Sequence, residues 1–70
     1  MSFQVGQTVA WSWGDGTGEG KIVERFTSDV TRTLKGSDVK RTASNDEPAF
    51  LIRQDDGDEV LKSCTELDAA

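Results

Sequence analysis

The sequence predicts a small all-β domain in which short antiparallel strands wrap into a strongly bent barrel, and three observations support this prediction. Residues 8–13 alternate apolar with small or polar side chains, which is the two-residue period of a half-buried strand. Glycine occupies every second position of residues 14–20, which is typical of a chain reversal. Residues 22–26 then carry apolar side chains on both faces, as expected for a bent strand shared between two sheets.

Further strands and turns follow along the chain. Residues 30–35 are rich in threonine and alternate, which predicts an extended segment. Residues 39–42 form either a short strand or an ordered loop. Residues 49–54 are the most apolar run after the first hairpin, so we place them centrally. The Asp-Gly pair that follows predicts a hairpin turn that returns the chain into a last strand at residues 59–62.

The end of the chain carries a capping signal. Ser63 and Glu66 have the spacing of a capping box, which predicts one final 3₁₀ or helical turn that places Leu67 on the barrel. Residues 1–4 and 68–70 are expected to fray. The whole chain of 70 residues is expected to be one domain, because its length allows only a small core.

Composition narrows the function classes. The formal net charge of -5 argues against a general nucleic-acid binder or a protein that binds anionic membranes, since neutralising phosphates needs a basic surface. The single cysteine, Cys64, excludes an internal disulfide and fits a reducing compartment. The N-terminal residues lack the basic and apolar regions of a secretion signal, and no window approaches a membrane span. These features predict a soluble cytoplasmic protein that does not bind membranes.

Several chemical motifs are absent. The glycine spacing matches neither a dinucleotide-binding loop nor a phosphate-binding Walker loop. The acidic run at residues 55–59 does not continue into the oxygen ligands of a calcium loop, because Ile52 and Gln54 stand where such ligands are needed. The chain has no histidine, so zinc lacks its usual ligands. We therefore expect no catalytic residues, no metal, no cofactor and no enzymatic activity.

Charge is unevenly spread. The turn at residues 55–59 carries four acidic residues, whereas residues 30–44 contain a single acid, Asp38. The simplest interpretation is that the basic side chains of this segment pair with the acidic turn or are exposed to solvent. The alternative is a docking face for an acidic partner or a nucleic-acid phosphate. The four basic residues concerned are Arg32, Lys35, Lys40 and Arg41.

A set of short motifs extends over nearly the whole chain. They are Val5-Gly6-Gln7, Val9-x-Trp11-x-Trp13-Gly14, Gly18-x-Gly20-x-Ile22, the segment from Phe26 to Ser37, Thr42-Ala43-Ser44, Pro48-Ala49-Phe50, Asp55-Asp56-Gly57 and Val60-Leu61-Lys62-Ser63. Together they resemble the hypervirulence-associated Tudor-like domain family of short bacterial and fungal proteins, and residues 26–37 are the most specific part. The resemblance implies an SH3-like, Tudor-type barrel of about five strands.

The resemblance implies little about activity, because that of the family is largely unassigned and it offers no catalytic residues to carry over. Phe50 stands where many relatives are expected to have tyrosine, which removes a hydroxyl group that could bind a ligand.

The function that follows is a non-catalytic interaction module that binds a protein or peptide partner through the barrel face or loops. One possible site is an aromatic cage for a cationic side chain, built from Trp11 or Trp13 with Phe50. A second possibility is nucleic-acid binding through residues 30–44. A third is a structural protein that self-associates through an edge strand or an exchanged hairpin, so the chain is expected to be a monomer or a homodimer.

Overall fold

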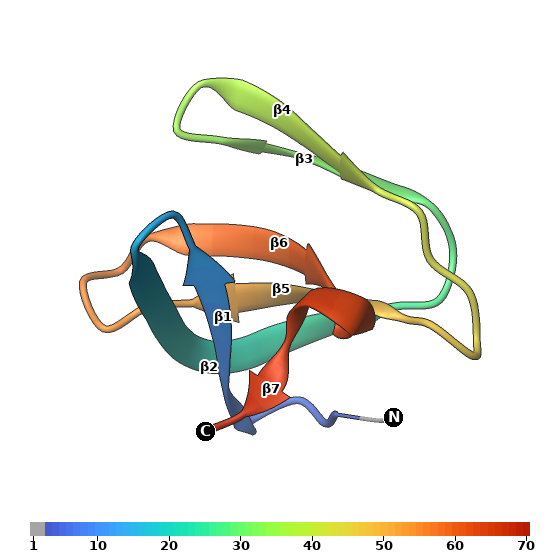
Figure 1. The fold of residues 1–70 in the computed structure, drawn as a ribbon. Coiled ribbons are helices and arrows are strands. Elements are labelled where there is room, and N and C mark those ends of the chain that lie inside the picture. Colours follow the sequence, from blue (N-terminus) through green and yellow to red (C-terminus); the bar gives the residue numbers. More distant parts are fainter. Residues whose placement is uncertain (1–2) are drawn as a thin grey trace.

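The alternating segments of the sequence form two antiparallel sheets in the computed structural model, which describes residues 3–70 (Figure 1). The larger sheet has five strands in the order β6-β5-β2-β1-β7, and the smaller is the hairpin of β3 and β4. The elements are β1 (Thr8–Trp13), β2 (Gly16–Phe26), β3 (Val30–Leu34), β4 (Ser37–Arg41), β5 (Ala49–Arg53), β6 (Glu59–Ser63), the 3₁₀ turn η1 (Cys64–Glu66) and β7 (Asp68–Ala69).

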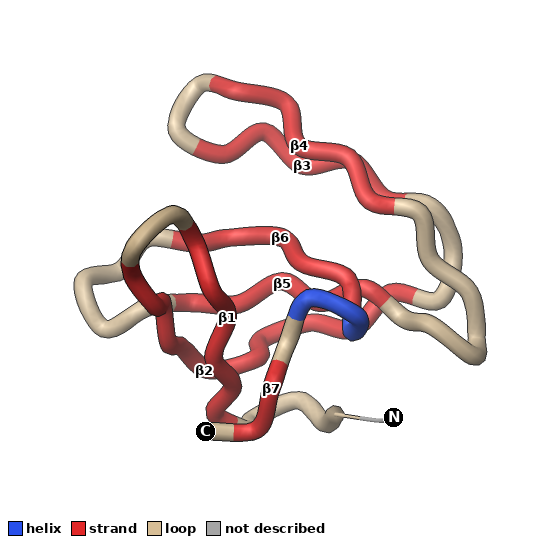
Figure 2. The backbone as a smooth tube through the Cα atoms, viewed as in Figure 1, coloured by secondary structure: helices blue, strands red, loops and turns tan. Residues whose placement is uncertain are grey.

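The fold is all-β, as expected, but the barrel is not closed. The β3–β4 hairpin shares no ladder with the five-stranded sheet within residues 3–70, and it lies over β6 at the end of two connecting segments (Figure 2). The expectation of one barrel of about five strands is therefore corrected to two sheets that do not close into a barrel. The physical reason is that the hairpin contacts the sheet through side chains. The backbone groups of β4 and β6 therefore form no ladder with each other.

Strand β2 is the bent strand that the sequence predicts. Its first half pairs with β1 and its second half pairs with β5. The register with β5 shifts between Ile22 and Glu24, which is the signature of a β-bulge and bends the strand. This bend lets one strand belong to both walls of the domain.

The reversal between β1 and β2 is shorter than the sequence suggests. The turn takes only residues 14–15, and the later glycines of the run belong to β2. They serve a different purpose there: Gly18 lies opposite Trp11, and a Cβ atom at this position would collide with the indole ring. Glycine is therefore needed to make room for an aromatic side chain as well as to turn the chain.

The apolar side chains form two clusters, one on each side of β5 and β6. The main core lies inside the curve of the larger sheet and contains Phe3, Val9, Trp11, Ile22, Phe50, Ile52, Cys64 and Leu67. The second core lies between the hairpin and the sheet and contains Val30, Ala49 and Leu61, with Phe26, Leu34, Val39 and Ala43 partly buried against it. The hairpin is thus attached mainly through the second core.

The capping box at the end of the chain is confirmed. The Ser63 side chain accepts the N–H of Thr65, and the Glu66 carboxylate accepts the N–H of Ser63. The resulting 3₁₀ turn places Leu67 in the main core, where it is 5% exposed.

The described residues at both chain ends make packing or ladder contacts, and the fraying of residues 1–4 and 68–70 stays a prediction. Phe3 is buried and its ring meets that of Phe50 edge-on, with centroids 5.9 Å apart. At the other end, the burial of Leu67 directs the chain along β1, where residues 68–69 pair with Val9 and Ala10 as β7. Residues 1–2 lie outside the described part of the chain.

The uncertain segment at residues 39–42 belongs largely to a strand, because β4 extends to Arg41. The turn before it consists of Lys35 and Gly36, both with positive φ (53° and 78°), which is the type I′ geometry of a two-residue hairpin. The predicted hairpin between β5 and β6 is confirmed: Gly57 has φ 90°, and the Gln54 N–H donates to the Asp58 carbonyl at 2.7 Å.

Candidate binding groove between β4 and β6

A groove of about 270 Å³ runs between the hairpin and β6. Three aliphatic side chains of the second core, from three strands, line it: Leu34, Val39 and Leu61. Val60 of β6 also borders the groove, although its side chain packs against the main core. The remaining lining residues are polar or charged: Lys35, Arg41, Gln54, Asp58, Glu59 and Lys62. The groove therefore combines an apolar floor with a charged rim, which is the usual composition of a site that holds an apolar group in a fixed orientation.

Two of the strands that line the groove, β4 and β6, each have an unpaired edge. Strand β6 pairs only with β5, and β4 pairs only with β3, so each has one side without a ladder in residues 3–70. Unpaired edges of this kind offer backbone N–H and C=O groups to another chain. The groove therefore carries main-chain donors and acceptors beside its apolar floor.

An ion pair joins the two hairpin tips at one end of the groove. The Lys35 ammonium lies 2.7 Å from the Asp58 carboxylate. The hydrogen bond that Lys35 donates to Asp58, together with the negative charge of that carboxylate, raises the pKa of Lys35 above its ordinary value. Because both side chains are substantially exposed, this contact is a weak tether between the hairpin and the β5–β6 turn.

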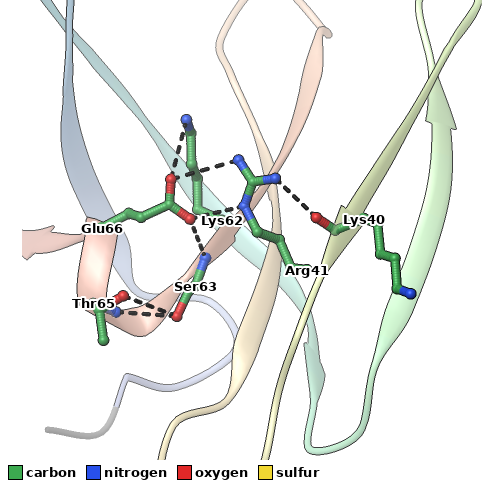
Figure 3. A network of polar contacts seen from close by, with 6 residues as sticks. All are labelled: Lys40, Arg41, Lys62, Ser63, Thr65 and Glu66. Atoms are coloured by element: carbon green, nitrogen blue, oxygen red, sulfur yellow. Dashed lines mark hydrogen bonds and ion pairs between the residues drawn. The ribbon is translucent and has the colours of Figure 1, made fainter.

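A denser polar network closes the other end (Figure 3). The Glu66 carboxylate accepts hydrogen bonds from Arg41 Nε and from the Ser63 N–H, both at 2.8 Å, and Lys62 Nζ lies 3.7 Å away. Arg41 also donates to the Lys40 carbonyl at 2.9 Å. Burial alone raises the pKa of Glu66, but the hydrogen bonds from Arg41 and Ser63 and the two nearby cations outweigh it, so the pKa is lowered. Glu66 therefore ties the hairpin to the 3₁₀ turn.

The basic segment of the sequence is largely paired within the molecule. Arg32 lies 3.7 Å from Glu24 and 4.8 Å above the centroid of the Phe26 ring. Lys35 and Arg41 pair with acids as described above, whereas Lys40 has no ion pair within residues 3–70. Most of the cations that a phosphate backbone would need are thus already neutralised, which weakens the interpretation of residues 30–44 as one basic docking face.

The aromatic cage that the sequence leaves open as one possibility has two of its residues inside the core. Trp11 and Phe50 are 4% and 0% exposed and belong to the main core, whereas Trp13 is 61% exposed. Two of the three proposed walls are therefore inaccessible, because a small domain with five aromatic residues needs most of them to fill its core. Alternation could not separate the two tryptophans, although the position of Trp13 beside the turn was a signal of exposure.

The groove residues were not among the site residues expected from sequence, apart from Lys35 and Arg41. A signal for them existed in β6, where the adjacent apolar residues Val60 and Leu61 must face opposite sides of the strand. Val60 packs against the main core and Leu61 belongs to the second. Two apolar faces on an edge strand indicate that a further layer covers it.

A second hollow, of about 310 Å³, lies between the β1–β2 ribbon and the β5–β6 turn. Its lining is mainly polar: Thr8, Glu19, Gly20, Lys21, Gln54, Asp55 and Asp56. Within residues 3–70 no group of three or more metal-ligating side chains is placed to hold an ion. This hollow lacks the apolar floor of the groove beside β6.

Comparison with known protein families now decides the family. The family of the Tudor domain of hypervirulence associated proteins matches residues 6–67 of the chain. The chain belongs to this hypervirulence-associated Tudor family. Searches of curated proteins and of solved structures found no significant match. In this Tudor domain, no helix of the described residues is long and apolar enough to cross a membrane.

Proposed function

We propose that this Tudor-type domain is a non-catalytic interaction module that binds an extended peptide segment of a protein partner in the groove between β4 and β6. The observation that carries the proposal is an apolar floor lying between two unpaired strand edges. Membership of a Tudor-type family supports a small binding module in general terms. The buried, unpaired thiol of Cys64 supports a reducing location, the cytoplasm.

The size of the groove favours a peptide over a small-molecule ligand. At about 270 Å³ it lies just below the volumes of roughly 300–1,000 Å³ that are typical of small-molecule sites. It has room for one or two apolar side chains, while the strand edges can engage the backbone that carries them. An interface this small is expected to give weak, transient binding.

The charge of the groove defines the partner further. Its lining contains three basic residues, Lys35, Arg41 and Lys62, and two acidic ones, Asp58 and Glu59. This slight excess of positive charge lies on a molecule whose net charge is -5. An apolar segment flanked by acidic residues complements this excess of one positive charge better than a segment flanked by basic residues.

The test uses two blocked peptides that alternate valine and threonine, one flanked by glutamates and the other by lysines. NMR titration of labelled protein is expected to shift the methyl signals of Leu34, Val39 and Leu61, more strongly with the glutamate peptide. Val39→Thr is expected to weaken binding because it places a hydroxyl group in the floor. Val5→Thr is the matched control, since Val5 is 60% exposed and does not line the groove.

Other outcomes would replace the proposal. Shifts centred on Trp13 would move the binding site to the β1–β2 turn. Shifts of residues 30–44 with an oligonucleotide, lost as salt rises, would favour the nucleic-acid alternative, for which Lys40 is the available cation. A mass that rises with concentration, together with groove shifts in the absence of peptide, would make a second copy of this chain the occupant.

A further inference from the structure

We propose that the bound segment adds to β6 as a further strand, with hydrogen bonds to the main-chain groups of Glu59 and Leu61. This inference rests on the proposed function and specifies how the partner is held. It follows from the pattern of hydrogen bonds along β6, which can be fixed independently at both ends of the strand.

The first end is the β5–β6 turn. The Gln54 N–H donates to the Asp58 carbonyl at 2.7 Å, so these two residues form a hydrogen-bonded pair. In an antiparallel ladder, bonded and non-bonded pairs alternate. The residues opposite each other in this ladder include Ile52 with Val60 and Leu51 with Leu61. The alternation therefore directs the N–H and C=O of Val60 towards β5 and those of Leu61 away from it.

The second end gives the same answer. The Cys64 N–H donates to the Pro48 carbonyl at 2.9 Å. The backbone N–H of Cys64 therefore points towards the β5 side, as that of Val60 does. The N–H of the preceding residue, Ser63, instead donates outward to the Glu66 carboxylate at 2.8 Å. Even-numbered residues of β6 thus bond to β5, and odd-numbered residues point to its free side.

Two residues consequently offer their backbone to the groove. Glu59 and Leu61 both line it, and no ladder partner stands on that side of β6 within residues 3–70. Leu61 is only 1% exposed, so water has little access to its main chain. A backbone pair that is shielded from water and outside any ladder gains more from a new hydrogen-bond partner than an exposed pair does.

The hairpin can yield to an incoming strand without breaking a ladder. It is held to the sheet by the second core and by ion pairs, of which the Lys35–Asp58 contact at the tip is exposed. Tilting the tip away opens the edge of β6 while the Arg41–Glu66 contact holds the base. The added strand then places alternate side chains beneath Leu34 and Val39, where the partner needs apolar residues.

The first measurement is amide hydrogen exchange with and without the glutamate-flanked peptide. In the free protein, the amides of Val60 and Lys62 are expected to be protected and those of Glu59 and Leu61 to exchange faster. Saturating peptide is expected to raise the protection of Glu59 and Leu61 by about tenfold or more, since each gains a hydrogen bond. Val60 and Lys62 serve as internal controls, because their bonds to β5 do not change.

The second measurement uses the peptide as the variable. N-methylation of every second amide removes the donors along one edge of the bound strand and leaves the other edge intact. One methylation pattern is expected to weaken binding by about tenfold, and the other to have little effect. Equal effects of the two patterns would overturn strand addition.

The failures of the two proposals are distinguishable. Methyl shifts in the groove without added protection at Leu61 would overturn strand addition and leave the groove as a side-chain docking site. Absence of groove shifts with either peptide would overturn the proposed function and this inference together.

Discussion

Trp11 and Gly18 face each other across the β1–β2 ladder, and the Trp11 indole occupies the space in which a side chain at Gly18 would begin. The pair explains how a chain of 70 residues buries its largest aromatic ring at 4% exposure. The ring therefore packs against the backbone of the neighbouring strand at Gly18.

Gly18→Ala is therefore expected to destabilise the domain by about 1–3 kcal/mol, the usual cost of an extra group in a filled core. The cost is steric, because the strand geometry itself accepts alanine. Urea unfolding followed by circular dichroism measures the change. Thr17→Ala is the control: Thr17 is exposed in the same strand, and its substitution is expected to change the free energy of unfolding by less than about 0.5 kcal/mol. Equal stability of both variants would contradict the packing account.

The two tryptophans are expected to respond in opposite ways to truncation. Trp13→Ala should change stability by less than about 0.5 kcal/mol, because the side chain is 61% exposed. Trp11→Ala should cost about 3–5 kcal/mol, which would unfold much of a domain this small. Acrylamide quenching of fluorescence provides the check: quenching should fall sharply in Trp13→Ala, which retains only the buried indole. Strong quenching in that variant would show that Trp11 is accessible.

The sequence predicts much of the larger sheet because the signals there are local. Alternation in residues 8–13, the Asp-Gly turn at Gly57 and the capping box of Ser63 and Glu66 each depend on neighbours within a few positions. Local patterns of this kind specify strands, turns and caps well.

The open barrel could not be predicted in the same way. Whether β4 pairs with β6 or only packs beside it depends on residues far apart in the chain, such as Val39 and Leu61. The same holds for Trp11 and Trp13, which share one alternating face and differ only in what covers them. The groove is consequently a product of tertiary packing. The one sequence signal for it was the pair of apolar faces on β6.

A substitution in the turn between β3 and β4 is expected to stabilise the domain. Lys35 adopts φ 53°, a conformation that costs a non-glycine residue about 1 kcal/mol. Its ion pair with Asp58 contributes little to stability, because solvent screens both exposed side chains. Lys35→Asn supplies the residue preferred at this position of a type I′ turn, so we expect a gain of about 0.5 kcal/mol in spite of the lost ion pair. Thermal and urea unfolding would measure it.

Asp58→Asn separates the two contributions, since it removes the ion pair and leaves the turn unchanged. This variant should be slightly less stable than the parent protein at neutral pH. Above the ordinary pKa of lysine, near 10.5, the difference should disappear as the raised pKa of Lys35 in the folded state is passed. A net loss of stability in Lys35→Asn, smaller than that in Asp58→Asn, would show that the ion pair outweighs the turn strain. A loss at least as large as that in Asp58→Asn would contradict the strain itself.

Glu66 is expected to make stability depend on pH in the acidic range. Its pKa is lowered in the folded state, so the folded protein holds the charged form more strongly than the unfolded chain does. The stabilisation is therefore fully present above the ordinary value of 4.5 and is lost as the pH falls through the lowered pKa. Glu66→Gln should cost about 1 kcal/mol at pH 7, since the amide still accepts hydrogen bonds but no longer pairs with Arg41.

The decisive quantity is the difference in unfolding free energy between the parent protein and Glu66→Gln, measured by urea titration from pH 7 to pH 3. The difference should be constant near neutrality and shrink below about pH 4.5. Protonation of Glu66 then removes from the parent protein the same negative charge that the substitution removes from the variant. Glu47→Gln, measured in the same way, is the matched control, since its carboxylate has no ion pair within residues 3–70. A difference for Glu66→Gln that does not change with pH would show that the Arg41–Glu66 contact does not tie the hairpin to the 3₁₀ turn in solution.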